Sequence, residues 1–330
     1  MMRLARRGFY GLVVFCTALL LQACQSLPLA TALSTSPSTP PSTPLPPGWS
    51  LAVLPGAQPD VALTVLKRSA LTPPTRYRVV VVPGSGCTGW LPIANRYFAG
   101  LLHAELWVLH KPLVDLQAGP AADCSPEFVR SDALPAWRDH ARAALRELVR
   151  RAPHSSMPVL LVGISEGAEL LPALAPELPG LQGVVMVSHA GLDPRETAEL
   201  QMLRQGQMPA WQALEKRQAS DADETLIVQG RTLRYWRSFW PWSLTQPLLA
   251  GQWPLLRVWG DADAQIPPAA YEKFATLAAQ RAAPFCDLRL AGADHGLQAP
   301  DQRDGLQVLW ARLEQWARAP AAGLCASALR

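Results

Sequence analysis

The sequence predicts an α/β protein in which helices flank a mostly parallel sheet. From about Trp49 onward, short apolar and β-branched runs alternate with segments of helical periodicity, which is the order typical of parallel strands joined by helices. Several of the runs are apolar throughout, as strands covered on both faces are. The 330 residues, 49% of them apolar, are enough for one sizeable core but short for two full domains.

The expected elements can be placed along the chain from these patterns. Strands are expected at Val61–Leu66, Tyr77–Val82, Glu105–Leu109, Val159–Val162, Gly183–Val187, Leu255–Trp259 and Cys286–Leu290. Helices are expected at Pro92–Leu102, Leu134–Arg151, Glu166–Leu174, Pro268–Arg281 and Gln302–Ala317. About 60 residues separate the fifth strand from the sixth, which is far longer than a usual connection and indicates an inserted segment.

Residues 1–23 have the organisation of a signal peptide. Three arginines precede an apolar run over residues 8–21, which is too short and wrongly flanked for a membrane span. The run ends in Leu-Gln-Ala-Cys at residues 21–24, which resembles the lipobox of bacterial lipoproteins. The resemblance implies cleavage after Ala23 and acylation of Cys24, with an anchor that faces the periplasm at the outer membrane. An ordinary signal peptide with an incidental Cys24 is the alternative, and either way the protein leaves the cytoplasm.

Residues 24–48 are rich in Pro, Ser and Thr and have almost nothing to bury. We interpret them as an extended tether between the lipidated Cys24 and a single folded domain over residues 49–330. Once the three N-terminal arginines are cleaved, 27 of the 30 basic residues remain against 26 acidic ones. This near-neutral balance argues against a nucleic-acid-binding protein.

The most informative segment is Pro158–Leu171, in which a buried strand leads through a Gly-x-Ser-x-Gly motif into a helix. A nucleophile at a sharp strand-to-helix turn needs small residues two positions before and after it, because the backbone there is tightly folded. Gly163 and Gly167 meet this need. The strand and the helix are the context that the motif requires, so Ser165 is the candidate nucleophile.

Candidate acid and base residues follow in the order serine, acid, histidine. The strand Leu255–Trp259 leads into Gly-Asp-Ala-Asp-Ala-Gln-Ile-Pro at residues 260–267, in which Asp263 is the candidate acid. Asp261, which could instead cap the turn, and Asp193, which follows an earlier strand, stay open as alternatives. An Asp-His-Gly sequence after the last strand places His295 on a loop from which a base can reach back to Ser165.

Together these segments resemble the α/β-hydrolase superfamily over residues 49–317. The resemblance implies an α/β-hydrolase fold with a helical cap at about residues 191–253, and a serine hydrolase that acts on a small ester or thioester. In the implied reaction His295 takes the proton of Ser165, whose Oγ attacks the carbonyl carbon while Asp263 orients the imidazole. Water then hydrolyses the acyl-enzyme. This chemistry needs no metal or organic cofactor, and the sequence has no His or Cys spacing of the metal-binding kind.

The segment Val79–Cys87 resembles the strand and loop that carry the first oxyanion-hole amide in this fold. The implied donors to the tetrahedral oxyanion are the backbone N–H groups of Ser85 and Glu166. The family often has His-Gly where this chain has Pro83-Gly84, which leaves the donor residue open. A glycine-rich turn without a catalytic part is the alternative.

The expected cap is rich in tryptophan. We interpret Trp236, Trp240 and Trp242 as an apolar wall over the substrate pocket, with a small satellite core under the cap as an equal alternative. His189 follows the strand Gly183–Val187, so it could line the same crevice or be held by structural hydrogen bonds.

Two other functions stay open on the same residues. The runner-up among enzymes is a peptidase acting on short peptides, because the same triad cleaves amides. A non-catalytic envelope lipoprotein on a hydrolase scaffold is the alternative outside catalysis, since a fold does not dictate function.

The folded body has four cysteines, an even number in a compartment that permits disulfides. Cys87 and Cys124 are both expected at the carboxyl edge of the sheet, whereas Cys286 begins the last strand and Cys325 lies in a small-residue tail. We therefore predict the pairs Cys87–Cys124 and Cys286–Cys325, with buried free thiols as the alternative.

Overall fold

The computed structural model describes residues 45–119, 122–152, 157–301 and 303–326. The predicted signal peptide, Cys24 and most of the predicted tether lie outside these residues. The last tether residues, 45–48, lie inside them, and the Pro46 carbonyl accepts a hydrogen bond from the N–H of Trp49, where the first strand begins. Within the described ranges, no helix is long and apolar enough to cross a membrane.

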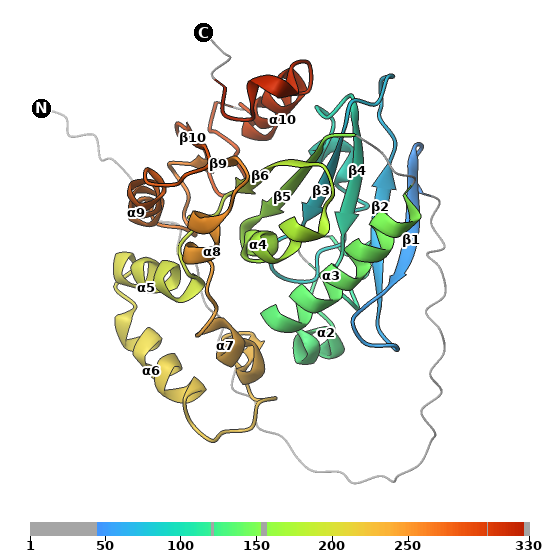
Figure 1. Ribbon diagram of the computed structural model, residues 1–330. Coiled ribbons are helices and arrows are strands. Elements are labelled where there is room, and N and C mark those ends of the chain that lie inside the picture. The colour runs from blue at the N-terminus through green and yellow to red at the C-terminus, as the bar shows by residue number, and fades with distance from the viewer. Residues whose placement is uncertain (1–44, 120–121, 153–156, 302, 327–330) are drawn as a thin grey trace, which may run out of the picture. The chain divides into compact units, whose positions relative to one another are not determined.

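An eight-stranded sheet forms the centre of the molecule (Figure 1). In spatial order its strands are β1, β2, β4, β3, β5, β6, β9 and β10, which span Trp49–Pro55, Ala62–Arg68, Ala104–Leu109, Tyr77–Val82, Val159–Ile164, Leu181–Val187, Leu255–Gly260 and Phe285–Leu290. β2 pairs antiparallel with β1 and with β4, and the other neighbouring pairs of this sheet are parallel. The mostly parallel sheet that the sequence predicts is confirmed.

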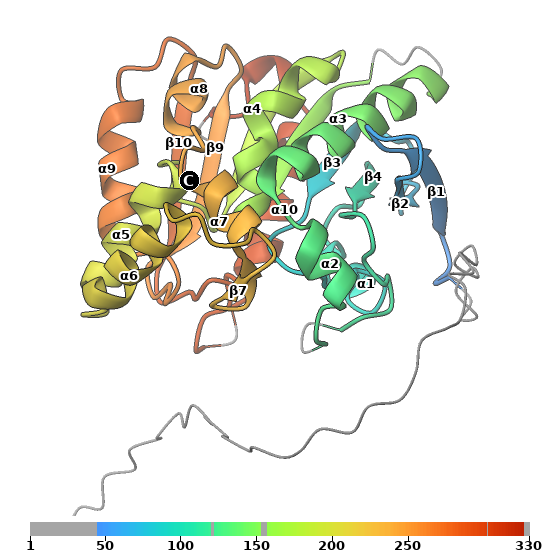
Figure 2. The ribbon, with the colours of Figure 1, turned by 90° about the horizontal axis from the view of Figure 1, so that it is seen from below.

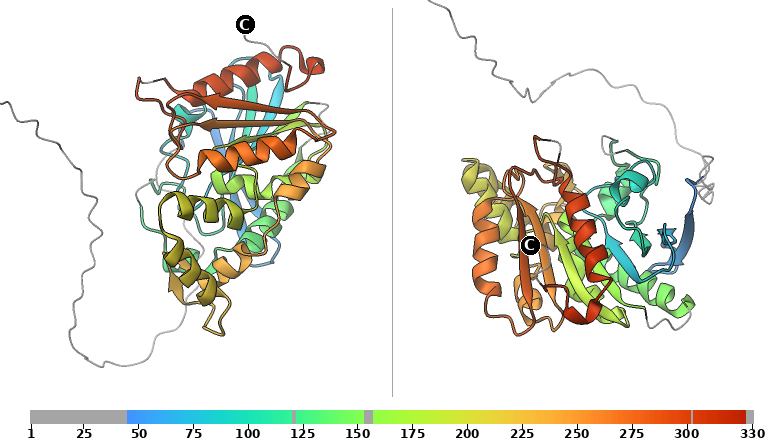
Figure 3. Two further views of the ribbon diagram at one scale, coloured as in Figure 1. Left: turned by 90° about the vertical axis from the view of Figure 1, so that its left-hand side faces the viewer. Right: turned by 90° about the horizontal axis from the view of Figure 1, so that it is seen from above.

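Helices cover both faces of this sheet. One face packs against α3, α4, α8 and α9 and the other against α1 and α10, and Figure 3 shows red α10 and orange α9 on opposite sides of the strands. Along β3, Val80 and Val82 point to the first face and Val79 and Val81 to the second, which is the two-residue period of a strand buried on both sides. These helices span Ala94–Tyr97 (α1), Leu134–Arg151 (α3), Leu171–Leu174 (α4), Thr245–Ala250 (α8), Pro268–Ala278 (α9) and Gly305–Trp316 (α10).

The long connection between β6 and β9 is a helical insertion, as the sequence predicts. Besides α8 it contains Pro194–Arg204 (α5), Met208–Gln218 (α6), the short strands Ile227–Val228 (β7) and Arg231–Thr232 (β8), and Leu233–Phe239 (α7). Figure 1 shows α5, α6 and α7 grouped together, and Figure 2 shows α7 beside α2 (Pro126–Ser131). The N–H of Leu134, at the start of α3, donates to the Ser238 hydroxyl of α7 at 3.3 Å, so the insertion is fixed to the central layer.

The edge strand β1 has no counterpart among the strands expected from the sequence. Only Trp49 and Leu54 of its seven residues are buried, and Val53 is 64% exposed. An edge strand with so few covered side chains has too weak an alternation to be recognised beside a proline-rich tether.

Two predicted helices are shorter or tighter than expected. The helix expected at Pro92–Leu102 is the single turn α1, because the carbonyls of Phe98 and Leu101 accept hydrogen bonds from the buried guanidinium of Arg68 at 3.0 and 2.5 Å instead of continuing a helix. The helix expected at Glu166–Leu174 begins as a 3-10 turn over Ser165–Leu170 and becomes α4 only afterwards.

Both predicted disulfide bonds are present. Cys87–Cys124 joins the loop after β3 to the loop that precedes α2, with the two Cα atoms 5.5 Å apart. Cys286–Cys325 joins β10 to the C-terminal segment, with a Cα separation of 5.4 Å. Leu324 beside this second bond is buried and lies against Gly183 of β6, so the segment that the bond holds is packed on the sheet.

Candidate active site

The chain turns sharply at Ser165, directly after β5. Ser165 has a φ of +49°, a left-handed conformation that a serine rarely adopts and that costs about 1–3 kcal/mol. A Cβ atom added at Gly163 would lie 2.6 Å from the Cα of Ala168, and one added at Gly167 would lie 2.1 Å from a carbonyl oxygen at the end of β3. The close approach of the backbone therefore requires glycine at both positions of the motif, which is the physical reason for the Gly-x-Ser-x-Gly pattern.

Ser165, His295 and Asp263 form a continuous chain of hydrogen bonds. His295 Nε2 is 3.1 Å from Ser165 Oγ, and His295 Nδ1 is 2.8 Å from Asp263 Oδ2. The three residues follow β5, β10 and β9, three parallel strands whose carboxyl ends meet at one edge of the sheet. The His295 loop is held in place by Ser188, whose hydroxyl donates to the His295 carbonyl oxygen at 2.6 Å.

Asp263 is a buried carboxylate with several hydrogen-bond donors from the protein. Its Oδ1 accepts hydrogen bonds from the backbone N–H groups of Gln265 and Ile266 at 2.7 and 3.0 Å, and its Oδ2 accepts one from the Tyr271 hydroxyl at 3.0 Å. Burial acts to raise the pKa of Asp263, but the hydrogen bonds from His295 and the backbone outweigh burial and lower the pKa. The carboxylate is therefore available to stabilise a positive charge on the imidazole.

The two alternative acids lie in other hydrogen-bond networks. Asp261 pairs with the Arg289 guanidinium and accepts a backbone N–H from the loop after β10. Asp193 accepts two backbone N–H groups at the start of α8. Of the three aspartates that the sequence leaves open, Asp263 is the one in contact with His295.

The loop after β3 lies against the nucleophile. A Cβ atom added at Gly84 would be 3.2 Å from the Cβ of Ser165, and Ser85 lines the two cavities that meet at Ser165. The Glu166 carboxylate accepts hydrogen bonds from Lys111 and Tyr235, on the side away from Ser165. The group of Glu166 that faces a substrate at Ser165 is therefore expected to be its backbone N–H. The N–H groups of Ser85 and Glu166 stay the predicted oxyanion donors.

Two cavities meet at Ser165, and both are also lined by Ser85 and Gln265. The first, of about 410 Å³, is bounded by the loop after β3 and by His295. The second, of about 310 Å³, lies under the insertion and is lined by α5 and α7 as well as by Ser165. A substrate whose carbonyl reaches Ser165 can thus extend to either side of it.

The predicted aromatic wall needs a correction. Trp236 and His189 do line the second cavity, but the described lining does not include Trp240 or Trp242. Trp240 stacks on Trp211 with ring centroids 4.6 Å apart, and the Trp242 indole N–H donates to the backbone carbonyl of Glu169 at 3.3 Å. Trp240 therefore packs within the insertion, and Trp242 packs against the segment that follows Ser165.

His189 is held by hydrogen bonds on both ring nitrogens. Its Nδ1 accepts the backbone N–H of Gly191 at 2.9 Å, so the proton sits on Nε2, which donates to Glu169 Oε1 at 2.9 Å. His189 is therefore held in one orientation, in which it contacts the Glu169 carboxylate.

A buried cluster of four charged side chains, which no pattern in the sequence indicates, surrounds the turn. Lys111 Nζ lies 2.6 Å from Glu166 Oε1 and 2.9 Å from Asp132 Oδ1. Arg231 of the insertion contacts both carboxylates, at 3.4 Å from Glu166 and 2.5 Å from Asp132, and the Tyr235 hydroxyl donates to Glu166 Oε2 at 2.7 Å. The cluster thus connects β4, α2, the nucleophile turn and the insertion.

The cluster fixes the charge of its members. Burial acts to raise the pKa of Glu166, but the positive charges of Lys111 and Arg231 outweigh it and lower the pKa. Burial acts to lower the pKa of Lys111, and Glu166 and Asp132 reverse the direction, so the pKa is raised. The one sequence signal that could have indicated this cluster is Lys111, a lysine just after a buried strand. Its partners, Asp132 and Glu166, are too far away in the chain to be recognised from the sequence.

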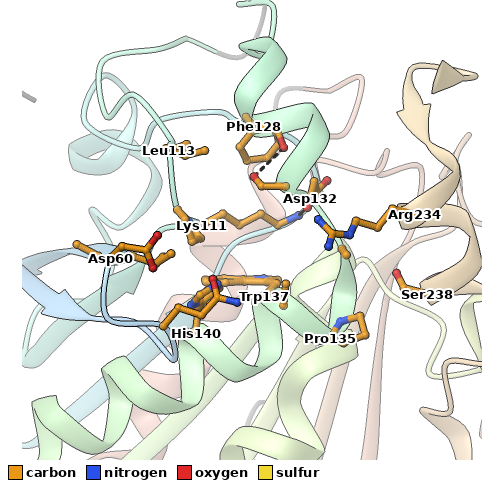
Figure 4. A pocket seen from close by; sticks show the side chains of 17 residues that line it. Asp60, Lys111, Leu113, Phe128, Asp132, Pro135, Trp137, His140, Arg234 and Ser238 are labelled. Atoms are coloured by element: carbon orange, nitrogen blue, oxygen red, sulfur yellow. Dashed lines mark hydrogen bonds and ion pairs between the residues drawn. The ribbon is translucent and has the colours of Figure 1, made fainter. Parts of the chain in front are cut away.

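A cavity larger than these two, of about 570 Å³, lies elsewhere, between α2, α3 and α7 (Figure 4). Figure 4 shows the Lys111 side chain extending across it to Asp132, above Trp137 and His140. None of its described lining residues belongs to the Ser165, His295 and Asp263 chain. Its size therefore does not make it the candidate active site.

Comparisons with known proteins define the fold. No protein-family model matches the chain, and no curated protein is significantly similar to it in sequence. Solved structures do match, among them the esterase domain of a Rhodothermus marinus protein, with 15% identity, a TM-score of 0.53 and coverage of 82% of this chain and 98% of that one. Est1E from Butyrivibrio proteoclasticus matches with 12% identity, a TM-score of 0.54 and coverage of 82% and 99%.

A third similar structure is a puromycin-hydrolyzing peptidase of Mycobacterium tuberculosis. It has 16% identity and a TM-score of 0.54, and the match covers 81% of this chain but 38% of that one. At such identities the likeness concerns the arrangement of the chain and not its substrates. On these matches and on its strand order, the chain has the α/β-hydrolase fold.

Proposed function

We propose that this chain is a serine hydrolase that cleaves a carboxylic ester or thioester through an acyl-enzyme on Ser165. The observation that carries the proposal is the unbroken hydrogen-bond chain from Asp263 through His295 to Ser165, at the point where two cavities meet. A serine beside a histidine that is itself oriented by a buried carboxylate is the arrangement that activates a hydroxyl as a nucleophile.

In the proposed reaction, His295 Nε2 accepts the Ser165 proton as Oγ attacks the substrate carbonyl carbon. The N–H groups of Ser85 and Glu166 hold the negative charge of the tetrahedral intermediate. His295 then protonates the departing alcohol or thiol, and a water attacks the acyl-enzyme with His295 again as base. Asp263 remains ionised throughout, which its four accepted hydrogen bonds favour.

We also propose that the chain works outside the cytoplasm, anchored through a lipid on Cys24 and facing the periplasm. Two disulfide bonds support an oxidising compartment, since such bonds are rare in the cytosol. The anchor itself rests on the sequence at residues 21–24.

The experiment that tests the hydrolase combines labelling with kinetics. A fluorescent alkyl phosphonate should form a covalent adduct on Ser165, located by peptide mass spectrometry, and Ser165→Ala should remove both the adduct and ester hydrolysis. The expected loss is on the order of 10⁴-fold or more in kcat. An adduct on another residue, or full activity in Ser165→Ala with an unchanged unfolding temperature, would refute the assignment.

A further inference from the structure

The cavity under the insertion contains three buried polar atoms that have no hydrogen-bond partner within the described structure. They are Glu169 Oε2, Thr197 Oγ1 and Gln201 Oε1, and all three residues line this cavity. Their exposures are 5%, 6% and 6%. Buried polar atoms are nearly always paired, so three unpaired ones in one cavity beside Ser165 need an explanation.

The surrounding hydrogen bonds fix which way two of these groups point. The Gln201 Nε2 group donates to the backbone carbonyl of Ala264 at 2.7 Å, which leaves Oε1 as the free acceptor. His189 occupies Glu169 Oε1 with its only N–H, which leaves Oε2. Thr197 and Gln201 are four residues apart on α5 and therefore lie on the same face of that helix.

The two carboxylates beside Ser165 have different partners. The carboxylate of Glu166 is compensated by Lys111 and Arg231, whereas the side-chain partner of Glu169 is His189. Burial raises the pKa of Glu169 by more than the contact with His189 lowers it, and the negative charges of Glu166 and Asp193 raise it further. A positively charged donor at Oε2 would stabilise the ionised carboxylate.

Much of the remaining wall is apolar, and the one arginine in the described lining, Arg231, is already paired with Asp132 and Glu166. The wall includes large side chains from α5, α6 and α7, namely Met202, Trp211, Trp236 and Phe239. The cavity thus joins an apolar surface to a carboxylate oxygen, an amide oxygen and a hydroxyl, a set that suits a primary ammonium group on an apolar chain.

We propose that this cavity binds a primary ammonium group of the substrate through Glu169, Thr197 and Gln201, so that the substrate class is an ester of an amino acid with an apolar side chain. His295, which protonates the leaving group in the proposed reaction, lines the other cavity and is not in the described lining of this one, so the amine lies on the acyl side of the carbonyl that Ser165 attacks. The inference rests on the proposed function, because it describes what the same serine would cleave.

The test uses three ethyl esters with the same carbon skeleton, those of leucine, 2-hydroxy-4-methylpentanoic acid and 4-methylpentanoic acid. The measured quantity is the ratio of kcat/KM for the leucine ester to kcat/KM for the unsubstituted ester. In the wild type we expect a ratio of about 10 or more. The kcat/KM for the hydroxy ester should lie between those of the other two esters.

Two substitutions should lower the ratio. Glu169→Gln keeps an acceptor for His189 but replaces Oε2 by an NH₂ group, so the ratio should fall by about 10- to 100-fold. Thr197→Val removes one hydroxyl at constant shape and should lower it by about 3- to 10-fold. The matched control is Thr245→Val, since the hydroxyl of Thr245 is also buried and unpaired but lies outside the described lining of the cavity. The ratio in this control should equal that of the wild type.

Each outcome decides one point. A ratio near 1 in the wild type, a higher kcat/KM for the hydroxy ester, or unchanged ratios in both variants would overturn the ammonium site while the hydrolase stands. If Glu169→Gln does not fold, Thr197→Val decides. If the wild type hydrolyses none of the esters and forms no phosphonate adduct on Ser165, the proposed function fails. Calorimetric titration of leucine ethyl ester into Ser165→Ala, with and without Thr197→Val, then tests the ammonium site alone, and absence of binding would overturn it.

Discussion

The charged cluster around Glu166 offers a quantitative test of how the nucleophile turn is held. We predict that Lys111→Met destabilises the protein by about 3–5 kcal/mol, because it removes one partner from a buried ion pair and leaves the other charge uncompensated. The exposed fractions of the Lys111, Asp132 and Glu166 side chains are 5%, 6% and 11%, so water replaces little of the lost interaction. Arg231 remains as a single cation between two carboxylates.

A double variant and an exposed ion pair test the size of this loss of stability. In Lys111→Met/Glu166→Gln the remaining pair, Arg231 and Asp132, is neutral again, so the double variant should recover most of the loss. The control is Arg130→Met, which removes a cation from an ion pair whose two side chains are 53% and 63% exposed and should cost less than about 1 kcal/mol. Urea unfolding followed by intrinsic tryptophan fluorescence measures all four proteins.

The pH dependence follows from the direction of the Glu166 shift. The pKa of Glu166 in the wild type lies below its ordinary value of 4.5, so its contribution to stability is present above about pH 4.5 and is lost as the pH falls through the lowered pKa. Without Lys111 this pKa rises. The difference in stability between wild type and Lys111→Met should therefore narrow as the pH falls from 7 to 4. A loss below about 1 kcal/mol at pH 7, a gap that is constant with pH, or no recovery in the double variant would refute the reasoning.

Three further predictions test the site and its surroundings. Asp263→Asn should lower kcat by about 10⁴-fold, and a larger loss in Asp193→Asn or Asp261→Asn would move the acid. Replacing Cys87–Cys124 with serines should lower the unfolding temperature and reduce esterase activity more than replacing Cys286–Cys325, and the reverse order of activities would count against a bracing role. Metabolic labelling with a fatty-acid probe should mark the wild type but not Cys24→Ala, and an unlabelled wild type would contradict the lipid anchor.

The sequence was informative where function depends on local backbone geometry. Gly163 is required by a contact under 3 Å with Ala168 inside the turn, and Gly167 by contacts under 3 Å with the end of β3, so a five-residue pattern reports the close backbone approach at the turn. His295 could be chosen among six histidines because parallel strands bring their carboxyl ends to one edge, which makes chain order a guide to proximity. Which of the three aspartates contacts His295 is known only from the structure, where it is Asp263.

Features that depend on long-range pairing could not be predicted in the same way. Asp132 and Arg231 are 99 residues apart in the chain, and neither belongs to a pattern that indicates a partner. Trp240 and Trp242 look the same as Trp236 in the sequence, yet the helical path of α7 and the turn after it send only Trp236 to the cavity beside Ser165. Composition identified an aromatic insertion but not which aromatic side chains face its interior.

Glu166 occupies the second variable position of the Gly-x-Ser-x-Gly motif, and in this chain its contacts restrict which residue can stand there. Its backbone N–H belongs to the proposed oxyanion hole, while its carboxylate accepts hydrogen bonds from Lys111 of the central layer and Tyr235 of the insertion. A carboxylate in a first helical turn is explained by the helix dipole alone, but that explanation predicts a solvent-exposed group, and this one is buried between two cations. Because Tyr235 of α7 donates to the carboxylate of the residue next to Ser165, a displacement of α7 that moves Tyr235 away breaks a hydrogen bond at the nucleophile turn. The position of the insertion and the geometry of the proposed oxyanion donor are therefore physically coupled.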